Sequence, residues 1–218
     1  MAQKMLMTED EYKASGMYFG MKQRTAQMKD FIYRIRPDGL SLLDISKIDQ
    51  RIRGAAKLIA KSHRVLIISR KNIAQEPIRK FCEVTQTGSV TGRFMPGTLT
   101  NSSYKKFVEA DLIMVVDPQV DYQALKEAVD ARVPVIGVCD SYNDTKNVDF
   151  VIPCNNKGVR SIVTMFWLLA RETMREKGLI KKDEDFKYKV DDFASGMPLD
   201  GSDEEEGGDE EGDEGEDE

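Results

Sequence analysis

Four short apolar runs decide the fold: VLIIS at 65–69, LIMVVD at 112–117, PVIGVC at 134–139 and FVI at 150–152. They lack the strict alternation of apolar and polar residues that marks a strand with one face in water. Continuous apolar runs of this length are typical of parallel strands that are buried on both faces. The four runs therefore predict an α/β protein with a mainly parallel sheet.

Helical segments separate these runs. Residues 77–84 and 122–131 have the length of crossover helices, with Asp121 as the cap of the second, and residues 88–92 are expected to form a weaker strand. The alternation of strands and helices predicts a doubly wound sheet flanked by helices on both faces.

A long apolar helix is expected after the last strand. It should begin near Asn155 or Asn156 and end at Lys177, with Gly178 as the residue that terminates it. Its apolar residues occupy most of its circumference, which predicts deep burial.

The N-terminal part predicts a helix-hairpin extension. Thr8 and Glu11 have the spacing of a capping box, so a helix is expected from about Glu9 to Ala14. Residues 31–45 form two extended runs around the turn sequence PDG, which predicts a β-hairpin. We expect Ser46, with Asp49, to cap the amphipathic basic helix that follows.

Charge divides the chain into two parts. Residues 200–218 contain 13 acidic and no basic residues, whereas residues 1–199 contain 25 acidic and 32 basic residues and so carry a formal charge of +7. A run of Gly, Asp and Glu has no apolar surface to bury, so we expect 200–218 to be a disordered acidic tail. Residues 1–199 are expected to form one domain, with an extension from about 179 in which Phe186, Tyr188 and Phe193 anchor to a partner.

The composition also bears on the compartment. No apolar stretch approaches the roughly 20 residues that cross a bilayer, and the N-terminus lacks the apolar core of a secretory signal. The three cysteines, Cys82, Cys139 and Cys154, are odd in number and widely spaced, which suits free thiols in a reducing compartment. These observations predict a cytoplasmic protein with no membrane partner.

Motifs for nucleotide binding are missing. The first apolar run is followed by RKNIA at 70–74, which has no glycine to let the backbone approach a pyrophosphate. Neither GxGxxG nor GxxxxGK[ST] occurs in the chain. We therefore expect no nucleotide cofactor.

Other reactive groups are isolated. His63 stands apart from cysteines and carboxylates and is interpreted as structural. Cys154 precedes the expected start of a helix, whose dipole favours a thiolate, but it lacks a basic partner. The cysteines are too scattered for zinc, and the acidic run 203–206 lacks the spacing of a calcium loop. We expect no metal, no catalytic residue and no small-molecule substrate.

Basic residues give a more coherent pattern, because many fall in expected turns or at helix ends, where side chains can reach the phosphates of a nucleic acid. Arg93 also lies in the loop GRFMPGT at 92–98, whose small residues allow close approach. The candidates for RNA binding are Lys22, Arg24, Arg34, Arg36, Arg51, Arg53, Arg93, Lys105, Lys106, Lys157 and Arg160.

Several motifs resemble one known family. The runs GRFMPGTLTN at 92–101 and IPCNNKG at 152–158 resemble the "S-two" family of small-subunit ribosomal proteins, nearest its archaeal and eukaryotic branch. Agreement continues in FIY at 31–33 and in the Asp117-Pro118 pair, and it covers roughly residues 8–180. Tyr18 departs from the pattern, since many relatives carry histidine there.

The resemblance implies a flavodoxin-like sheet and a structural role in the small ribosomal subunit, with contacts to ribosomal RNA and to neighbouring ribosomal proteins. It implies that surfaces, not a cleft, carry the function. Two alternatives stay open from the residues alone. One is an interaction protein that acts without RNA through its tail or residues 186–193, and the other is an enzyme with an unusual nucleotide cleft.

Overall fold

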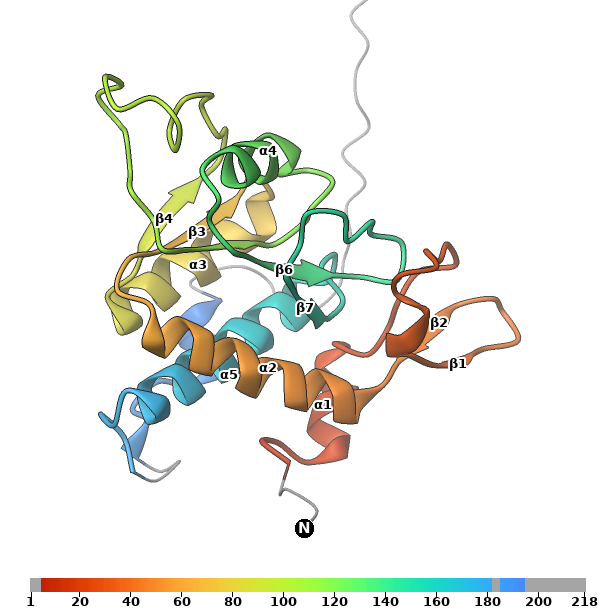
Figure 1. Cartoon of the computed structure of the whole chain (residues 1–218). Coiled ribbons are helices and arrows are strands. Elements are labelled where there is room, and N and C mark those ends of the chain that lie inside the picture. Colours follow the sequence, from red (N-terminus) through yellow and green to blue (C-terminus); the bar gives the residue numbers. More distant parts are fainter. Residues whose placement is uncertain (1–4, 182–184, 195–218) are drawn as a thin grey trace, which may run out of the picture.

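A five-stranded parallel sheet forms the centre of the computed structural model, which describes residues 5–181 and 185–194 (Figure 1). Its strands are β3 (Val65–Ser69), β4 (Gly88–Thr91), β5 (Leu112–Val115), β6 (Val135–Cys139) and β7 (Phe150–Pro153). The spatial order is β4-β3-β5-β6-β7, which is the order of flavodoxin-like folds. This confirms the α/β, doubly wound sheet expected from the apolar runs.

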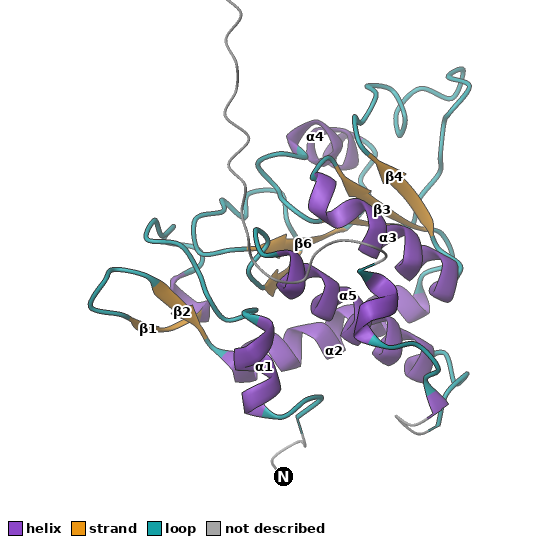
Figure 2. Cartoon of the chain, turned by 180° about the vertical axis from the view of Figure 1, so that it is seen from behind, coloured by secondary structure: helices purple, strands orange, loops and turns teal. Residues whose placement is uncertain are grey.

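The two faces of the sheet bury alternate residues of each strand. Val65 and Ile67 of β3 join a core with helices α2 (Ile45–Lys61), α3 (Asn72–Thr85) and α5 (Val159–Glu176). Leu66 and Ile68 face the opposite side, where they meet α4 (Tyr122–Asp130). Figure 2 shows the chain from behind, with α3 and α5 nearest the viewer. Both faces are covered, which explains why the three central strands, β3, β5 and β6, are buried at every position.

One face departs from the expected arrangement of helices. The connection from β4 to β5 contains no helix in the structure, and its residues 92–111 cover the sheet beside α4 as an irregular loop. Phe94 and Leu99 from this loop are buried against the strands. A loop with two buried apolar anchors therefore takes the place of a second helix on that face.

Two helix starts differ from the expected ones. Helix α3 begins at Asn72, five residues before the expected start at Pro77, which stays within the helix. Pro77 has no N–H to donate to the Ile73 carbonyl, so α3 lacks one intrahelical hydrogen bond there and still continues to Thr85. Helix α5 begins at Val159 because the Asn155 side chain accepts hydrogen bonds from the backbone N–H groups of Lys157 and Gly158, which holds a turn before the helix.

The N-terminal extension has the predicted form. Helix α1 (Glu9–Ser15) has a complete capping box between Thr8 and Glu11. Strands β1 (Ile32–Ile35) and β2 (Ser41–Leu43) make an antiparallel hairpin. The expected cap of α2 was wrong: the Asp44 side chain accepts from the Ser46 N–H, whereas Asp49 is bonded to residues elsewhere.

The segment after α5 folds back on the body of the protein. Phe186 and Phe193 are buried in the main core, and the indole N–H of Trp167 donates to the Tyr188 carbonyl over 2.8 Å. The expectation that these aromatic residues anchor to a partner was therefore wrong for Phe186 and Phe193, which α3 and α5 hold. The expected acidic tail, 200–218, lies outside the described residues. No helix in the described part is long and apolar enough to cross a membrane.

Candidate functional site

The carboxyl ends of β3 and β5 mark the switch point of the sheet, because the chain continues from β3 to one side and later returns to the other. Doubly wound sheets bind their ligands at this position. Here a side chain fills it: the Lys71 ammonium lies 2.7 Å from the Asp117 carboxylate. Lys71 also donates to the backbone carbonyl of Asn156 over 2.8 Å.

Three more polar side chains close the same position. The Tyr142 hydroxyl and the Asn143 amide each donate to Asp117 over 2.9 Å. The Asn156 amide in turn donates to the Asn143 side-chain oxygen over 2.9 Å. Asp117, Asn143 and Asn156 are completely buried. We call these five residues the switch-point network: Lys71, Asp117, Tyr142, Asn143 and Asn156.

The network keeps the buried Asp117 carboxyl in its ionised form. Burial pushes the pKa of Asp117 upward, but the hydrogen bond and charge of Lys71, together with the Tyr142 hydroxyl, bring that pKa below its ordinary value. Asp117 is thus ionised and paired. A pyrophosphate at this position would have to displace both charges of a buried ion pair, so the network leaves no ready-made place for a nucleotide.

Two neighbouring carboxyls are less well satisfied. Burial raises the pKa of Asp121 to about 6, although its Oδ1 accepts the Arg70 N–H over 2.8 Å. Burial likewise raises the pKa of Asp140 to about 6. The second oxygen of each carboxyl, Oδ2, is buried without a hydrogen-bond partner. No cluster of three or more metal-ligating side chains occurs among residues 5–181 and 185–194.

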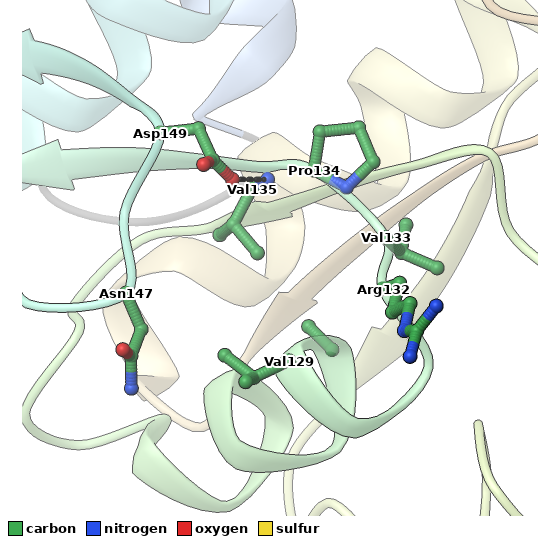
Figure 3. A pocket seen from close by; sticks show the side chains of 8 residues that line it. Val129, Arg132, Val133, Pro134, Val135, Asn147 and Asp149 are labelled. Atoms are coloured by element: carbon green, nitrogen blue, oxygen red, sulfur yellow. Dashed lines mark hydrogen bonds between the residues drawn. The ribbon is translucent and has the colours of Figure 1, made fainter.

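Figure 3 shows a hollow at the opposite, amino end of β6, where α4 ends. Val129, Val133 and Pro134 line it, and Arg132 and Asn147 stand at its border. The Asp149 carboxylate accepts the Val135 N–H over 2.8 Å, which is a structural bond at the start of the strand. The hollow lies away from the switch point and holds no cluster of reactive groups.

The structure brings the first four RNA-binding candidates together around the hairpin. Arg34 and Arg36 extend from β1 and its turn, and Lys22 and Arg24 lie on the segment that precedes the hairpin. All four are exposed. Arg36 is 3.2 Å from Asp38 in an exposed ion pair.

Ser141 attaches this segment to the body of the protein. Its hydroxyl accepts the Met21 N–H over 2.8 Å, and its carbonyl accepts the Thr25 N–H over 3.0 Å. Gly20 approaches so closely that a Cβ there would lie 3.0 Å from the Ser141 hydroxyl. Lys22 and Arg24 are therefore carried by a backbone that is fixed next to the switch-point network.

Arg51 and Arg53 on α2 are engaged in internal contacts. The Arg51 guanidinium lies 5.2 Å from the ring centre of Phe31 and 4.9 Å from that of Phe150, so it joins the hairpin to the sheet. Arg53 donates to Asp49 over 2.9 Å, and Asp49 also accepts the Tyr12 hydroxyl. Both arginines are only partly exposed.

The remaining candidates lie on two other surfaces. Arg93, Lys105 and Lys106 are exposed on the loop 92–111, which projects at the end of the molecule far from the hairpin (Figure 1). Lys157 and Arg160 are exposed at the start of α5, and the Lys157 ammonium lies 4.7 Å from the centre of the Tyr142 ring. The candidates thus lie in three places: around the hairpin, on the loop 92–111 and at the start of α5.

Sequence reasoning did not find Glu127 as a functional residue. It projects from α4 and is almost fully buried, where its carboxylate accepts the backbone N–H groups of Gly97 over 2.8 Å and Leu99 over 3.1 Å. The only sequence signal is an acidic residue on the apolar side of a helix. Glu127 holds the loop that presents Arg93.

The two isolated reactive groups have ordinary surroundings. Cys154 is completely buried, and burial raises the pKa of its thiol to about 12. The helix start does not activate it as a thiolate. His63 is exposed where α2 passes into β3.

These features define a flavodoxin-like domain whose ligand position is occupied by its own side chains. Comparison with known proteins then gives the family. The family model "Ribosomal protein S2" matches residues 13–109 and 104–175. The chain is 44% identical over 195 residues to the small ribosomal subunit protein uS2 of Thermoplasma volcanium, covering 88% of this chain and 98% of that one.

A second relative agrees. The chain is 46% identical over 191 residues to the small ribosomal subunit protein uS2 of Methanococcus maripaludis, covering 87% of this chain and 86% of that one. The chain therefore belongs to the ribosomal protein S2 family. Members of this family are structural components and not enzymes, so the enzyme alternative is set aside.

Proposed function

We propose that this protein is a structural constituent of the small ribosomal subunit, where it binds ribosomal RNA and neighbouring ribosomal proteins and supports subunit assembly. Family membership across residues 13–175 is the observation that carries the proposal. The switch-point network adds a physical reason, since a filled ligand position leaves the surfaces of the domain to make its contacts.

The exposed cations supply the binding chemistry. Lysine and arginine side chains neutralise phosphates and release counterions, so affinity should fall steeply as salt rises. We assign this role to the nine exposed candidates in these three places: Lys22, Arg24, Arg34, Arg36, Arg93, Lys105, Lys106, Lys157 and Arg160. Arg51 and Arg53 contribute by fixing the hairpin and the N-terminal segment, through the contacts they make inside the protein.

Basic residues in three places suit an assembly component. Cations gathered in one groove would follow a single RNA helix, whereas cations at both ends of the molecule can hold separate RNA elements at a fixed distance. The rigid sheet and the buried network between them set that distance. The exposed apolar side chains of Val120, which precedes α4, and of Val129 on α4 are available for a neighbouring protein.

Sedimentation of a cell lysate tests the proposal. The protein should travel with small subunits at moderate salt, and nuclease treatment should release it to light fractions. A light peak that nuclease does not change, at every salt concentration, would contradict the ribosomal role. It would favour the interaction protein that acts without RNA.

A further inference from the structure

A β-bulge interrupts strand β1 at Tyr33. Ile32 pairs with Leu43 and Arg34 pairs with Leu42, so Tyr33 is the extra residue between two consecutive pairs. Bulges redirect side chains and are common next to functional sites. Tyr33 is 76% exposed, the most exposed large hydrophobic side chain in the described part of the protein.

A groove adjoins this tyrosine. It has a volume of about 540 Å³ and lies between β1 and the segment 24–29, which is within the range of about 300–1,000 Å³ that small ligands occupy. Ala26, Ile32 and Ile35 give it an apolar lining. The side chains that stand with them around the groove are Arg24, Thr25, Lys29, Tyr33 and Arg34.

The cations around the groove are not neutralised by the protein itself. No described carboxylate lies within ion-pair distance of Arg24, Lys29 or Arg34, whereas Arg36 nearby is paired with Asp38. An apolar lining with an aromatic ring and three unpaired cations matches the two parts of a nucleotide, a flat base and a phosphate.

We propose that this groove binds an unpaired nucleotide of RNA, with its base stacked on Tyr33 and the adjoining phosphates held by Arg24, Lys29 and Arg34. The inference rests on the proposed function and adds the kind of RNA that the hairpin recognises. A paired base is already stacked inside a helix and cannot reach the ring, so the site selects single-stranded or bulged RNA.

The same edge could instead pair with a protein strand, because within the described residues β1 pairs with β2 alone. Two features oppose that reading. The bulge at Tyr33 breaks the regular spacing of backbone donors and acceptors that an added strand needs. The charge of Arg34 on this short edge also discourages strand addition, and Arg24 and Lys29 line the same groove from the preceding segment.

The groove is built in advance of any ligand. One wall is fixed because the Thr25 hydroxyl donates to the Asn143 carbonyl over 2.9 Å, next to the switch-point network. The other wall is fixed where Arg51 lies between Phe31 and Phe150 at the start of β1. A preformed site spends little of its binding free energy on ordering the protein.

Binding to two RNA probes at low ionic strength tests the proposal on the full chain. The first probe is an unstructured 12-nucleotide RNA of mixed sequence, with its length chosen as roughly the site size of a single-strand binding domain. The second is the abasic form of the same strand, which keeps the phosphates and lacks the bases. The variants are Tyr33→Ala, Tyr33→Phe and, as a matched control, Tyr122→Ala, since Tyr122 on α4 is 62% exposed.

Loss of base stacking predicts that Tyr33→Ala weakens binding of the 12-nucleotide RNA by about 5- to 150-fold. It should leave the abasic strand unchanged. Tyr33→Phe should bind like the unmodified protein because the ring is kept, and Tyr122→Ala should also bind like it. Arg34→Gln should weaken both probes and lower the salt slope by about 0.7.

Three results would overturn the inference. One is an equal effect of Tyr33→Ala on both probes, and another is no effect on either. The third is normal RNA binding by Tyr33→Ala with loss of a neighbouring ribosomal protein from the assembled subunit, which would assign the groove to that protein. Failure of the unmodified protein to bind either probe or to enter small subunits would instead count against the proposed function itself.

Discussion

Lys71 and Asp117 form an ion pair of 2.7 Å at the switch point of the sheet, and both side chains are largely removed from solvent. Replacing Lys71 by methionine would leave the Asp117 carboxylate buried and unpaired. We expect Lys71→Met to reduce the free energy of unfolding by about 3–5 kcal/mol, as measured by urea denaturation.

The double variant Lys71→Met/Asp117→Asn should recover part of that loss, because it removes the uncompensated charge and keeps an acceptor for Asn143. Arg70→Met is the matched control, since Arg70 is the exposed neighbour of Lys71. Equal unfolding free energies for Lys71→Met and Arg70→Met would show that the buried ion pair does not stabilise the fold.

Acidification should stabilise the protein above pH 5. In the native state Asp121 and Asp140 have pKa values of about 6 because they are buried, against an ordinary value of 3.8. Between these values the native state binds more protons than the unfolded chain, so stability rises as pH falls. From pH 7 to pH 5.5 each carboxyl should add about 0.8 kcal/mol.

Thermal unfolding over this pH range measures the effect, and the melting temperature should rise as pH falls. The variants Asp121→Asn and Asp140→Asn should each flatten the profile, because the titrating group is gone. Asp117 acts in the opposite sense, since its pKa is lowered, but its contribution is lost only below the ordinary range of an aspartate. A melting temperature that falls steadily from pH 7 to 5.5 would contradict the assignment.

Glu127 should control the basic loop. Its carboxylate accepts two backbone N–H groups from that loop, at Gly97 and Leu99. Glu127→Gln replaces one accepting oxygen by a donor and leaves a buried N–H without a partner. We expect a loss of about 1–3 kcal/mol in stability and faster hydrogen exchange at residues 97–99.

Lys126→Gln is the control for Glu127→Gln, because Lys126 is exposed on the same helix. RNA binding should weaken only in Glu127→Gln, through the loop that carries Arg93. Unchanged exchange at 97–99 in that variant would mean that Phe94 and Leu99 fix the loop without the carboxylate.

The sheet could be predicted because a strand that is buried on both faces has a continuous run of apolar residues in the sequence. Val65–Ser69 and Val135–Cys139 are buried at every position, so an apolar run was a sufficient signal. What covers the α4 face of the sheet was harder to predict. Phe94 and Leu99 fill the place of a helix, and two isolated apolar residues in a Gly-containing loop do not show on which face they pack.

The site was predictable only in part. The turn sequence of the hairpin was enough to predict where its basic residues lie. The switch-point network, by contrast, joins Lys71, Asp117 and Asn156, which lie far apart in the sequence. Such a network depends on strand order, which apolar runs do not specify. The bulge at Tyr33 likewise depends on the register between β1 and β2, and a one-residue shift leaves no trace in composition.

Charge reversal at Arg93 and Lys157 should reduce incorporation into small subunits. The two residues are exposed, one on the loop 92–111 and one at the start of α5, so Arg93→Glu/Lys157→Glu removes one expected phosphate contact at each. The fold should survive, because neither side chain is buried. Quantitative sedimentation measures incorporation, and circular dichroism of the purified variant checks folding.

A matched control reverses charge at two exposed lysines that were not candidates, Lys57→Glu/Lys126→Glu. This control changes the net charge by the same amount. Equal incorporation of both double variants would show that Arg93 and Lys157 act only through the overall charge.

The acidic C-terminal segment should weaken RNA binding by the free protein. Removing residues 200–218 changes the formal net charge from −6 to +7. RNA is a polyanion, so it is attracted more strongly to the truncated protein than to the full-length protein. The truncated protein should bind unstructured RNA more tightly at low salt, with the difference disappearing as salt screens the charges. A variant of full length with the acidic residues of 200–218 changed to Asn and Gln should behave like the truncation, because charge and not length is responsible. If both variants bind RNA as the unmodified protein does yet enter small subunits more slowly, the segment acts instead through contacts with basic ribosomal proteins.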